Sequence, residues 1–409
     1  MGRALRHRDF AIFSLFGWFS SVGLWVQRIA VQWLVWKLTG SFALLGAIAL
    51  ADVAVTLLVM PFAGTVADRV DRLKLARLAQ AGAMVVAGTI AALVVVDAIN
   101  IHLLFALMMA NGGVVAFWTP VRYTITPNLV PRDDLSAALG VGSMLFNLAQ
   151  FVGPAVAGLL ISQWGLGYAF AFNCLSYTGL FIALYLIKLN AQEHRKKEQT
   201  GFLADIKEGI AYIRARPGIG TLMTWFFFSS LCMRSYLDLL PGFADGVFAE
   251  GADGVATLGM FSGLGALAAG IFVANFVALK GLTRLIFTGM IVGIAFQALY
   301  ALAPGFEIGL FAITGMGVCV LIMSTGSMVL MQSTLHGEVR GRVMSLWGLI
   351  FRGGPALGAL IIGSAAELWG FRAPMLGATL LFFCVWAVIM PRRRALAAAL
   401  ERPPEERAG

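Results

Sequence analysis

Long apolar runs separated by short polar loops follow one another along the whole chain. Twelve runs reach the roughly 20 mostly apolar residues that a membrane span needs: 10–36, 42–62, 75–96, 100–121, 136–162, 166–187, 219–240, 255–278, 282–303, 306–331, 341–365 and 372–390. The runs do not alternate polar and apolar positions as barrel strands do. Because backbone in lipid forms its hydrogen bonds only in helices or closed barrels, the pattern predicts an all-α integral membrane protein with twelve transmembrane helices.

The longest polar stretch, residues 189–218, divides these runs into two sets of six. It predicts a six-helix bundle over 1–188, a second bundle over 219–390 and a cytoplasmic tail over 391–409. Apolar residues recur in the stretch at helical spacing: Phe202, Ile206, Ile210 and Ile213. They predict an amphipathic helix on the inner membrane surface, with a solvated linker as the alternative.

A short motif occurs once in each half. Residues 153–155 and 354–356 are both Gly-Pro-Ala, and a glycine precedes each by 13 positions, at Gly140 and Gly341. Two six-helix halves related by a parallel repeat form one class of secondary transporter, with the substrate site near the bilayer midplane. The repeat therefore predicts a transporter built from two six-helix pseudo-repeats.

Composition excludes a soluble protein and charge indicates topology. Of 409 residues, 59% are hydrophobic and 12% are charged, against roughly 45–50% and about 25% in soluble domains.

The net charge of +9 comes from short loops, so it does not indicate nucleic acid. Of the 30 lysines and arginines, 25 lie in one set of alternate loops and the termini, and two lie in the other set. This bias predicts that both termini are cytoplasmic, in a cell inner (plasma) membrane.

Patterns for catalysis, metal binding or nucleotide binding are missing from the sequence. The four cysteines lie far apart in apolar runs, and the four histidines lie in loops or at the ends of runs. The chain contains no Gly-x-x-x-x-Gly-Lys-Ser/Thr phosphate loop. We therefore expect no enzyme activity, no cofactor, no metal site and no ATP-driven step.

The loop after the second run carries a family signature. Residues 64–74 are Gly-Thr-Val-Ala-Asp-Arg-Val-Asp-Arg-Leu-Lys, a stretch that resembles the Gly-x-x-x-Asp-Arg-x-x-Arg-x-Lys loop of the major facilitator superfamily. The resemblance covers essentially the whole chain and implies the major facilitator fold. Asp71 stands where the family often has glycine. The matching positions are Gly64, Asp68, Arg69, Arg72 and Lys74.

We interpret this loop as a gate between the two halves. Gly64 would let a neighbouring helix approach closely. Asp68 and Arg69 would form charge-assisted hydrogen bonds that hold one state and break in the other. The alternative is a tight hairpin that simply follows the positive-inside rule.

The fifth run resembles the antiporter motif of drug–proton exchangers. It matches at Gly140, Gly153, Pro154 and Gly158, and two other glycine positions of the motif are alanine here. Ordinary packing of small residues is the alternative interpretation. Three more stretches, 21–27, 127–135 and 209–213, resemble an exporter branch that includes the enterobactin exporter and macrolide efflux proteins.

Charged residues inside the apolar runs are candidates for function, since each costs roughly 2.5–3.5 kcal/mol to insert. Asp52 and Arg28 lie at matched depths, about 14–15 Å from the predicted outer ends of their runs. We predict that they pair and that Asp52 couples transport to protons; a structural ion pair is the alternative. Arg234 and Asp238, one helical turn apart near the predicted outer end of their run, predict an interfacial pair or an outer gate.

Polar and aromatic side chains within the runs predict a large cavity for an amphiphilic ligand. Arg352, deep in the eleventh run, predicts contact with an anionic substrate group or with backbone carbonyls, and snorkelling toward the inner face is the alternative. The other polar cavity candidates are Gln27, Gln32, Asn111, Asn147, Gln150, Gln297 and Ser324. The aromatic candidates are Trp25, Trp33, Trp118, Phe146, Trp225, Phe226, Phe227 and Trp347.

Together these features predict a secondary active transporter. We expect it to export a small hydrophobic or amphiphilic molecule, such as a drug or siderophore, in exchange for protons by alternating access. Its partners would be this small molecule, protons and membrane lipids, and the protein would act as a monomer without nucleic acid. Two alternatives remain: a lipid or lysophospholipid flippase on the same fold, and a transport-inactive sensor or scaffold.

Overall fold

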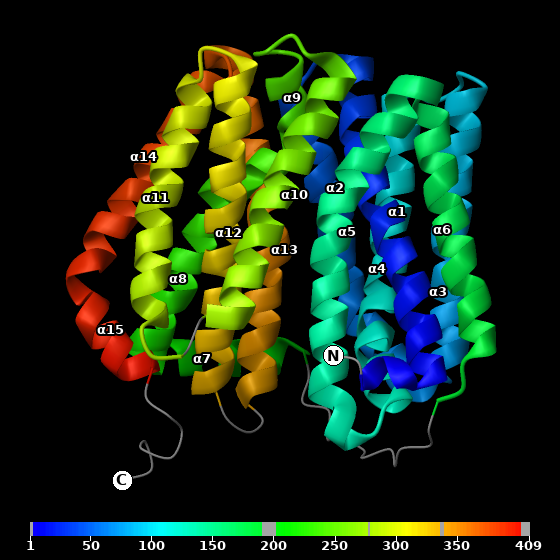
Figure 1. Ribbon diagram of the computed structural model, residues 1–409, viewed down its shortest axis with the longest axis horizontal. Coiled ribbons are helices and arrows are strands. Elements are labelled where there is room, and N and C mark those ends of the chain that lie inside the picture. Colours follow the sequence, from blue (N-terminus) through cyan, green and yellow to red (C-terminus); the bar gives the residue numbers. More distant parts are fainter. Residues whose placement is uncertain (1–2, 190–201, 277–278, 336–338, 402–409) are drawn as a thin grey trace. The chain divides into compact units, whose positions relative to one another are not determined.

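The computed structural model is all-α over the residues that it describes, 3–189, 202–276, 279–335 and 339–401 (Figure 1). Its α-helices are α1 (Arg8–Thr39), α2 (Phe42–Arg69), α3 (Arg72–Val95), α4 (Ile101–Leu129), α5 (Leu135–Trp164), α6 (Leu166–Leu186), α7 (Phe202–Ala215), α8 (Pro217–Cys232), α9 (Leu240–Ala244), α10 (Gly251–Phe276), α11 (Leu282–Leu302), α12 (Phe306–Thr334), α13 (Val339–Trp369), α14 (Arg372–Ile389) and α15 (Arg393–Leu400). Four short 3₁₀ helices join them in the described ranges: η1 (Ala4–Arg6), η2 (Arg132–Asp134), η3 (Arg234–Asp238) and η4 (Met390–Arg392).

Eleven of the predicted spans are confirmed as long apolar helices. In the described part of the chain, 11 helical segments are long and apolar enough to cross a membrane. The predicted span at 219–240 differs, because the chain there is divided into α8, η3 and α9. α8 has 16 residues and a length of about 24 Å, which is short of the roughly 30 Å of a hydrocarbon core.

The break after α8 lies where α13 crosses it closely. A Cβ placed on Gly358 would overlap the carbonyl oxygen of Leu231. The backbone oxygen of Cys232, the last residue of α8, accepts a hydrogen bond of 2.8 Å from the Gln297 side chain of α11. A carbonyl freed by the broken helix is therefore satisfied inside the bundle, as a membrane interior requires.

The chain divides into two compact units. Unit 1 comprises residues 1–40, 48–197 and 249–260, and unit 2 comprises 41–47, 198–248 and 261–409. Two helices are divided between the units. The first turn of α2 belongs to unit 2, and the beginning of α10 belongs to unit 1.

The two units repeat one packing scheme. In unit 1, α1 packs against α5 and α6, while α3 packs against α4 and α6. In unit 2, α8 packs against α13 and α14, while α11 packs against α12 and α14 (Figure 1). The Gly-Pro-Ala motifs occupy equivalent places, since Gly153 of α5 contacts Trp25 of α1 and Gly354 of α13 contacts Ser230 of α8.

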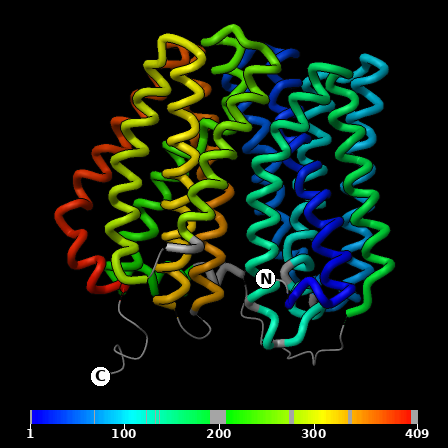
Figure 2. Tube along the Cα trace, in the orientation of Figure 1, coloured from blue at the N-terminus to red at the C-terminus, as the bar shows by residue number. Residues whose placement is uncertain are grey.

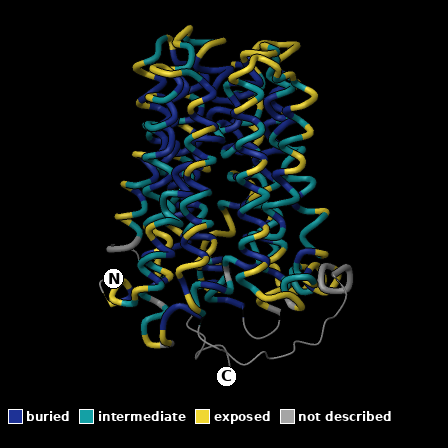
Figure 3. Tube along the Cα trace, turned by 90° about the vertical axis from the view of Figure 1, so that its right-hand side faces the viewer, coloured by how far each residue is buried: buried dark blue, intermediate teal, exposed yellow. Residues whose placement is uncertain are grey.

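The long helices expose large apolar side chains. Figure 3 shows buried and exposed positions alternating along the same helices. Leu58 and Phe62 of α2 are 72% and 71% exposed, and Val388 of α14 is 70% exposed. Exposed apolar residues at this density belong in lipid, which agrees with a multi-pass membrane protein.

The polar stretch for which an amphipathic helix is predicted contains α7, and the position of this helix on the membrane surface stays a prediction. Its side chains are described from Lys207 onward. A Cβ placed on Gly209 would lie 3.0 Å from the Leu346 side chain of α13, and Glu208 forms an ion pair with Arg342 of the same helix. α7 is therefore held to unit 2 through α13.

The predicted cytoplasmic tail begins with further structure. The chain turns at η4 from α14 into α15, drawn in red in Figure 2. Glu401 accepts hydrogen bonds of 2.7 Å from the backbone N–H groups of both Gly281 and Thr283. This carboxylate supplies partners for the free N–H groups at the start of α11 and anchors α15 there.

Candidate transport site

A polar network in the core of unit 1 includes Asp52. One carboxylate oxygen of Asp52, on α2, accepts a hydrogen bond of 2.8 Å from the amide of Asn111 on α4. Asn111 is buried, at 5% exposure, and Asp52 is half-buried. Asp52 therefore lies at a contact between α2 and α4.

The backbone beside Asp52 is packed directly against α4. The hydroxyl of Thr56, which is fully buried, lies 2.9 Å from the Asp52 carbonyl oxygen and 3.0 Å from the Gly112 carbonyl oxygen. A Cβ on Gly112 would overlap the Asp52 carbonyl. Glycine at this position therefore lets α2 and α4 approach closely enough to place Asn111 on the carboxylate.

A second polar cluster joins α6 to α1. The Asn173 amide on α6 donates to the side-chain oxygen of Gln27 on α1, and the Ser176 hydroxyl lies 3.1 Å from the Asn173 side-chain oxygen. The Gln80 amide on α3 donates a hydrogen bond of 3.3 Å to the backbone oxygen of Tyr177 on α6. Within unit 1, polar side chains therefore join α2 to α4, and α6 to both α1 and α3.

Arg28 lies on α1, next to Gln27. Its guanidinium carbon is 5.3 Å from the ring centroid of Trp25, a distance compatible with a cation–π interaction. The pairing of Arg28 with Asp52 stays a prediction. Also on α1, the indole nitrogen of Trp25 and the side-chain oxygen of Gln32 are buried without a hydrogen-bond partner among the described residues.

The small residues of the antiporter-like motif have distinct surroundings. A Cβ on Gly153 would overlap Trp25 of α1, and a Cβ on Gly158 would overlap the side chain of Ala256 on α10. Pro154 lies 2.9 Å from the Cβ that Gly259 would carry. Gly140 faces open space among the described residues. In this structure Gly153 and Gly158 bring α5 close to α1 and α10.

The remaining cavity candidates of unit 1 are partly accessible. Trp33 of α1 and both Asn147 and Gln150 of α5 are half-buried. Asn147 and Gln150 are about one helical turn apart, so they share a face of α5. Trp25 approaches the same region of α5, since its ring centroid lies 6.3 Å from that of Phe146.

In unit 2, aromatic rings are stacked beneath an arginine. The Trp347 ring on α13 lies 4.8 Å from the Phe226 ring and 5.0 Å from the Phe351 ring, and the two phenylalanine rings lie 6.5 Å apart. The guanidinium of Arg234, on η3, lies 3.9 Å above the Phe351 ring. Arg352, the next residue on α13, is exposed.

Two candidates of unit 2 lie in the buried interior. Gln297 is fully buried and donates to the freed carbonyl of Cys232. Asp238, at 3% exposure, lies in η3 four residues after Arg234. The predicted pairing of Arg234 with Asp238 stays a prediction.

The signature loop lies at the junction of α2 and α3. Asp71 is the N-cap of α3, and its carboxylate accepts a hydrogen bond of 2.8 Å from the Lys74 backbone N–H. Arg69 and Lys74 are exposed and Arg72 is half-buried. A Cβ on Gly64 would meet none of the described atoms. The side chain of Asp68 lies outside the described residues.

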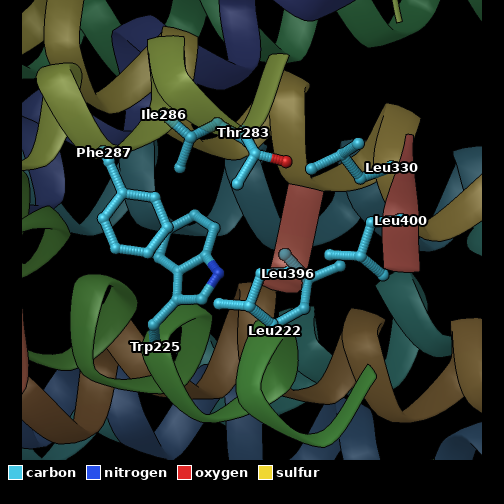
Figure 4. A pocket seen from close by; sticks show the side chains of 8 residues that line it. All are labelled: Leu222, Trp225, Thr283, Ile286, Phe287, Leu330, Leu396 and Leu400. Atoms are coloured by element: carbon cyan, nitrogen blue, oxygen red, sulfur yellow. The ribbon is translucent and has the colours of Figure 1, made fainter. Parts of the chain in front are cut away.

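A small apolar pocket in unit 2 is a weaker candidate site. Figure 4 shows side chains from α8, α11, α12 and α15 converging on it. Thr283 supplies a hydroxyl, and most of the lining is aliphatic or aromatic. Leu396 and Leu400 of α15 are among its walls, at 7% and 2% exposure. The pocket therefore lies where α15 packs against α8, α11 and α12.

Several residues whose side chains form hydrogen bonds in unit 1 were not among the predicted candidates. These are Thr56, Gln80, Asn173 and Ser176. Gln80 and Asn173 lie inside apolar runs, so their polarity was a usable signal. The hydroxyl residues carried none, since Ser and Thr occur widely in transmembrane helices as packing residues.

Two helical units that repeat one packing scheme in a multi-pass membrane protein define a transporter of the major facilitator type, not an enzyme. The family model described as transmembrane secretion effector matches residues 3–405. The chain belongs to this family, which confirms the predicted resemblance.

Relatives agree with that assignment. The staphyloferrin A transporter of Staphylococcus aureus is 24% identical, with 85% of this chain and 87% of the relative aligned. Macrolide efflux protein A of Streptococcus pyogenes is 25% identical over 90% of this chain and 91% of its own length. The inward-facing, occupied structure of a bacterial homologue of the human lysosomal transporter Spinster has a TM-score of 0.70 at 15% identity, covering 97% of both chains.

Proposed function

We propose that this transporter exports a small hydrophobic or amphiphilic molecule in exchange for protons, by alternating access, with Asp52 as the coupling residue. The observation that carries the proposal is the Asp52 carboxylate, hydrogen-bonded to Asn111 inside the polar network of unit 1. The similarity to macrolide efflux protein A supports the efflux direction.

The chemistry of this carboxylate is suited to coupling. An ionised carboxylate only accepts hydrogen bonds, whereas a protonated one also donates. Proton binding at Asp52 therefore changes both its charge and the hydrogen bonds that Asn111 and the neighbouring network can make. A proton drives a conformational cycle only if it favours one state over the other, and such a rearrangement supplies that difference.

Arg28 and the half-buried residues of α5 complete the proposed site. Arg28 would hold Asp52 in its charged form while the two are close. Asn147, Gln150 and Trp33 would contact the substrate, with the buried Trp25 nitrogen and Gln32 oxygen offering hydrogen bonds. In the same proposal the protein is a monomer in the cell inner membrane, with both termini cytoplasmic as the loop charges predict.

The decisive experiment is pH-gradient-driven flux in proteoliposomes containing the wild-type protein or the Asp52→Asn variant. The substrates are a radiolabelled macrolide, staphyloferrin A and a lysophospholipid. We expect driven flux of one of the first two to fall about tenfold or more, because one charge crossing 100 mV is worth about 2.3 kcal/mol, roughly a factor of 50. Binding of that substrate should persist.

Asp97→Asn is the matched control, since Asp97 is an exposed acid in the loop between α3 and α4. Its flux should equal that of the wild type. Undiminished driven flux in Asp52→Asn would remove Asp52 from the coupling step. Transport confined to the lysophospholipid would favour the flippase alternative.

A further inference from the structure

A carboxylate from α13 caps the first turn of α2. Ser41 is the residue before α2, and its hydroxyl oxygen accepts a hydrogen bond of 3.2 Å from the Leu44 N–H. The same hydroxyl donates to Glu367 Oε1 at 2.6 Å. The Ala43 N–H donates to that oxygen at 3.1 Å. Glu367 therefore binds both the capping side chain and a free backbone N–H of α2.

The first turn of α2 contains no acidic residue of its own. Helix N-termini favour a nearby negative charge, because their free N–H groups carry the positive end of the helix dipole. Glu367, 326 residues after Ser41, provides this charge from another helix. The cap is thus a tertiary contact that joins the start of α2 to the end of α13.

The surrounding packing makes this contact tight. A Cβ on Gly46 would overlap the backbone of Leu360, and a Cβ on Gly363 would overlap the carbonyl of Phe42. The Phe42 ring lies 5.0 Å from the Phe371 ring. Two glycines therefore allow α2 and α13 to meet backbone to backbone beside the Glu367 hydrogen bonds.

α2 continues from this cap into unit 1. Residues 41–47 belong to unit 2, whereas the helix from Ile48 onward belongs to unit 1. Asp52 lies about 14 Å along the same helix from Ala43, at 1.5 Å per residue. The Glu367 contact and the Asp52 carboxylate therefore involve the same helix, α2.

We propose that Glu367 is a positioning residue for transport: it holds the first turn of α2 on α13 in the conformation seen here, and this contact must open when the predicted outer side opens. The proposal rests on alternating access, as does the proposed function. It does not depend on Asp52, on the substrate or on the coupling ion.

The test measures how often the capped turn is accessible to a reagent. Leu45, in this turn, has 0% exposure. Leu45→Cys is introduced into a protein whose four native cysteines are changed to alanine, and the protein is placed in lipid nanodiscs. The rate at which a charged maleimide labels the introduced thiol then reports opening, without substrate, gradient or knowledge of orientation.

We expect Glu367→Ala to raise the labelling rate about tenfold, equivalent to about 1.4 kcal/mol. Glu367→Gln retains an accepting oxygen without the charge, so it should raise the rate by a smaller factor, about threefold. Ser41→Ala should also raise the rate. Glu307→Ala is the matched control, because Glu307 is an exposed acid in unit 2 at the first turn of α12.

Thermal unfolding of each variant distinguishes local opening from loss of fold. If Glu367→Ala does not fold, the labelling rate of Glu367→Gln is compared with that of Glu307→Ala, and a higher rate in Glu367→Gln supports the proposal. Equal labelling of the introduced thiol in the Glu367 variants and the parent overturns the proposal, as does an equal rise in Glu307→Ala. Failure of Asp52→Asn to alter driven flux leaves this result unaffected, so the two proposals can fail separately.

Discussion

At the scale of single residues, Asp52 depends on its backbone neighbours as well as on its side-chain partner. Asn111 binds the carboxylate, while Thr56 binds the carbonyls of both Asp52 and Gly112. Asp52 and Asn111 could be placed inside apolar runs from the sequence, but nothing in it indicated that Gly112 sets the distance between their helices. Such a contact depends on how two helices pack, and hydrophobic periodicity does not specify that.

Gly112 offers a sharp test, because its neighbour Gly113 is a natural control. Gly112→Ala should reduce the free energy of unfolding by about 1–3 kcal/mol, the usual cost of overpacking a tight core, and should lower driven flux by displacing Asp52. A Cβ on Gly113 meets no described atom, so Gly113→Ala should keep both stability and flux. Thermal unfolding and proteoliposome flux check the pair. If Gly112→Ala and Gly113→Ala have equal unfolding free energies and equal flux, the close approach of α2 to α4 is unimportant.

Arg352 is exposed on α13, next to the ring that Arg234 covers. Arg352→Gln should weaken binding of an anionic substrate such as staphyloferrin A by about tenfold, the loss of one charge-assisted hydrogen bond of about 1.5 kcal/mol or more. Binding of an uncharged ligand of similar size should change little. Equilibrium binding to the purified protein measures both affinities. A uniform loss accompanied by a lower melting temperature would instead assign Arg352 a structural role.

At the scale of elements, helix positions were predictable and helix contacts were not. Eleven spans were found from apolar length alone, because the bilayer imposes that length on every helix. The division of the run at 219–240 was missed, since it lies where α13 presses Gly358 against Leu231. The Glu367 cap on α2 was missed for a similar reason: its partners lie 326 residues apart.

The start of α3 explains the departure from the family signature. Asp71 is the N-cap of that helix, and glycine is also an acceptable N-cap, only a few tenths of a kcal/mol weaker. Asp71→Gly should therefore lower the free energy of unfolding by a few tenths of a kcal/mol, and Asp71→Ala by about 1 kcal/mol. Thermal unfolding checks the order of the variants. A larger loss in Asp71→Gly than in Asp71→Ala would contradict the capping role.

At the scale of the whole molecule, the repeat seen in the sequence reflects a repeat in packing. The two Gly-Pro-Ala motifs each bring the fifth helix of a half against the first, through Gly153 in unit 1 and Gly354 in unit 2. α2 contributes to both units, with its first turn in unit 2, Asp52 in unit 1 and the signature loop at its far end.

The signature loop itself provides the last prediction. Asp68 is the penultimate residue of α2, so a contact made there acts on the same helix as Asp52 and the Glu367 cap. Asp68→Asn removes a charge that would hold one state, and hydrogen bonds to charged groups contribute about 1.5–3 kcal/mol. We expect flux to fall about tenfold or more while melting temperature and membrane insertion are retained. Asp71→Asn controls for loss of charge from the same loop, because asparagine caps a helix as well as aspartate does. If Asp68→Asn and Asp71→Asn show equal flux, the loop does not act as a gate. Its charges would then only set the orientation of the helices in the membrane, and the gate would lie elsewhere on α2.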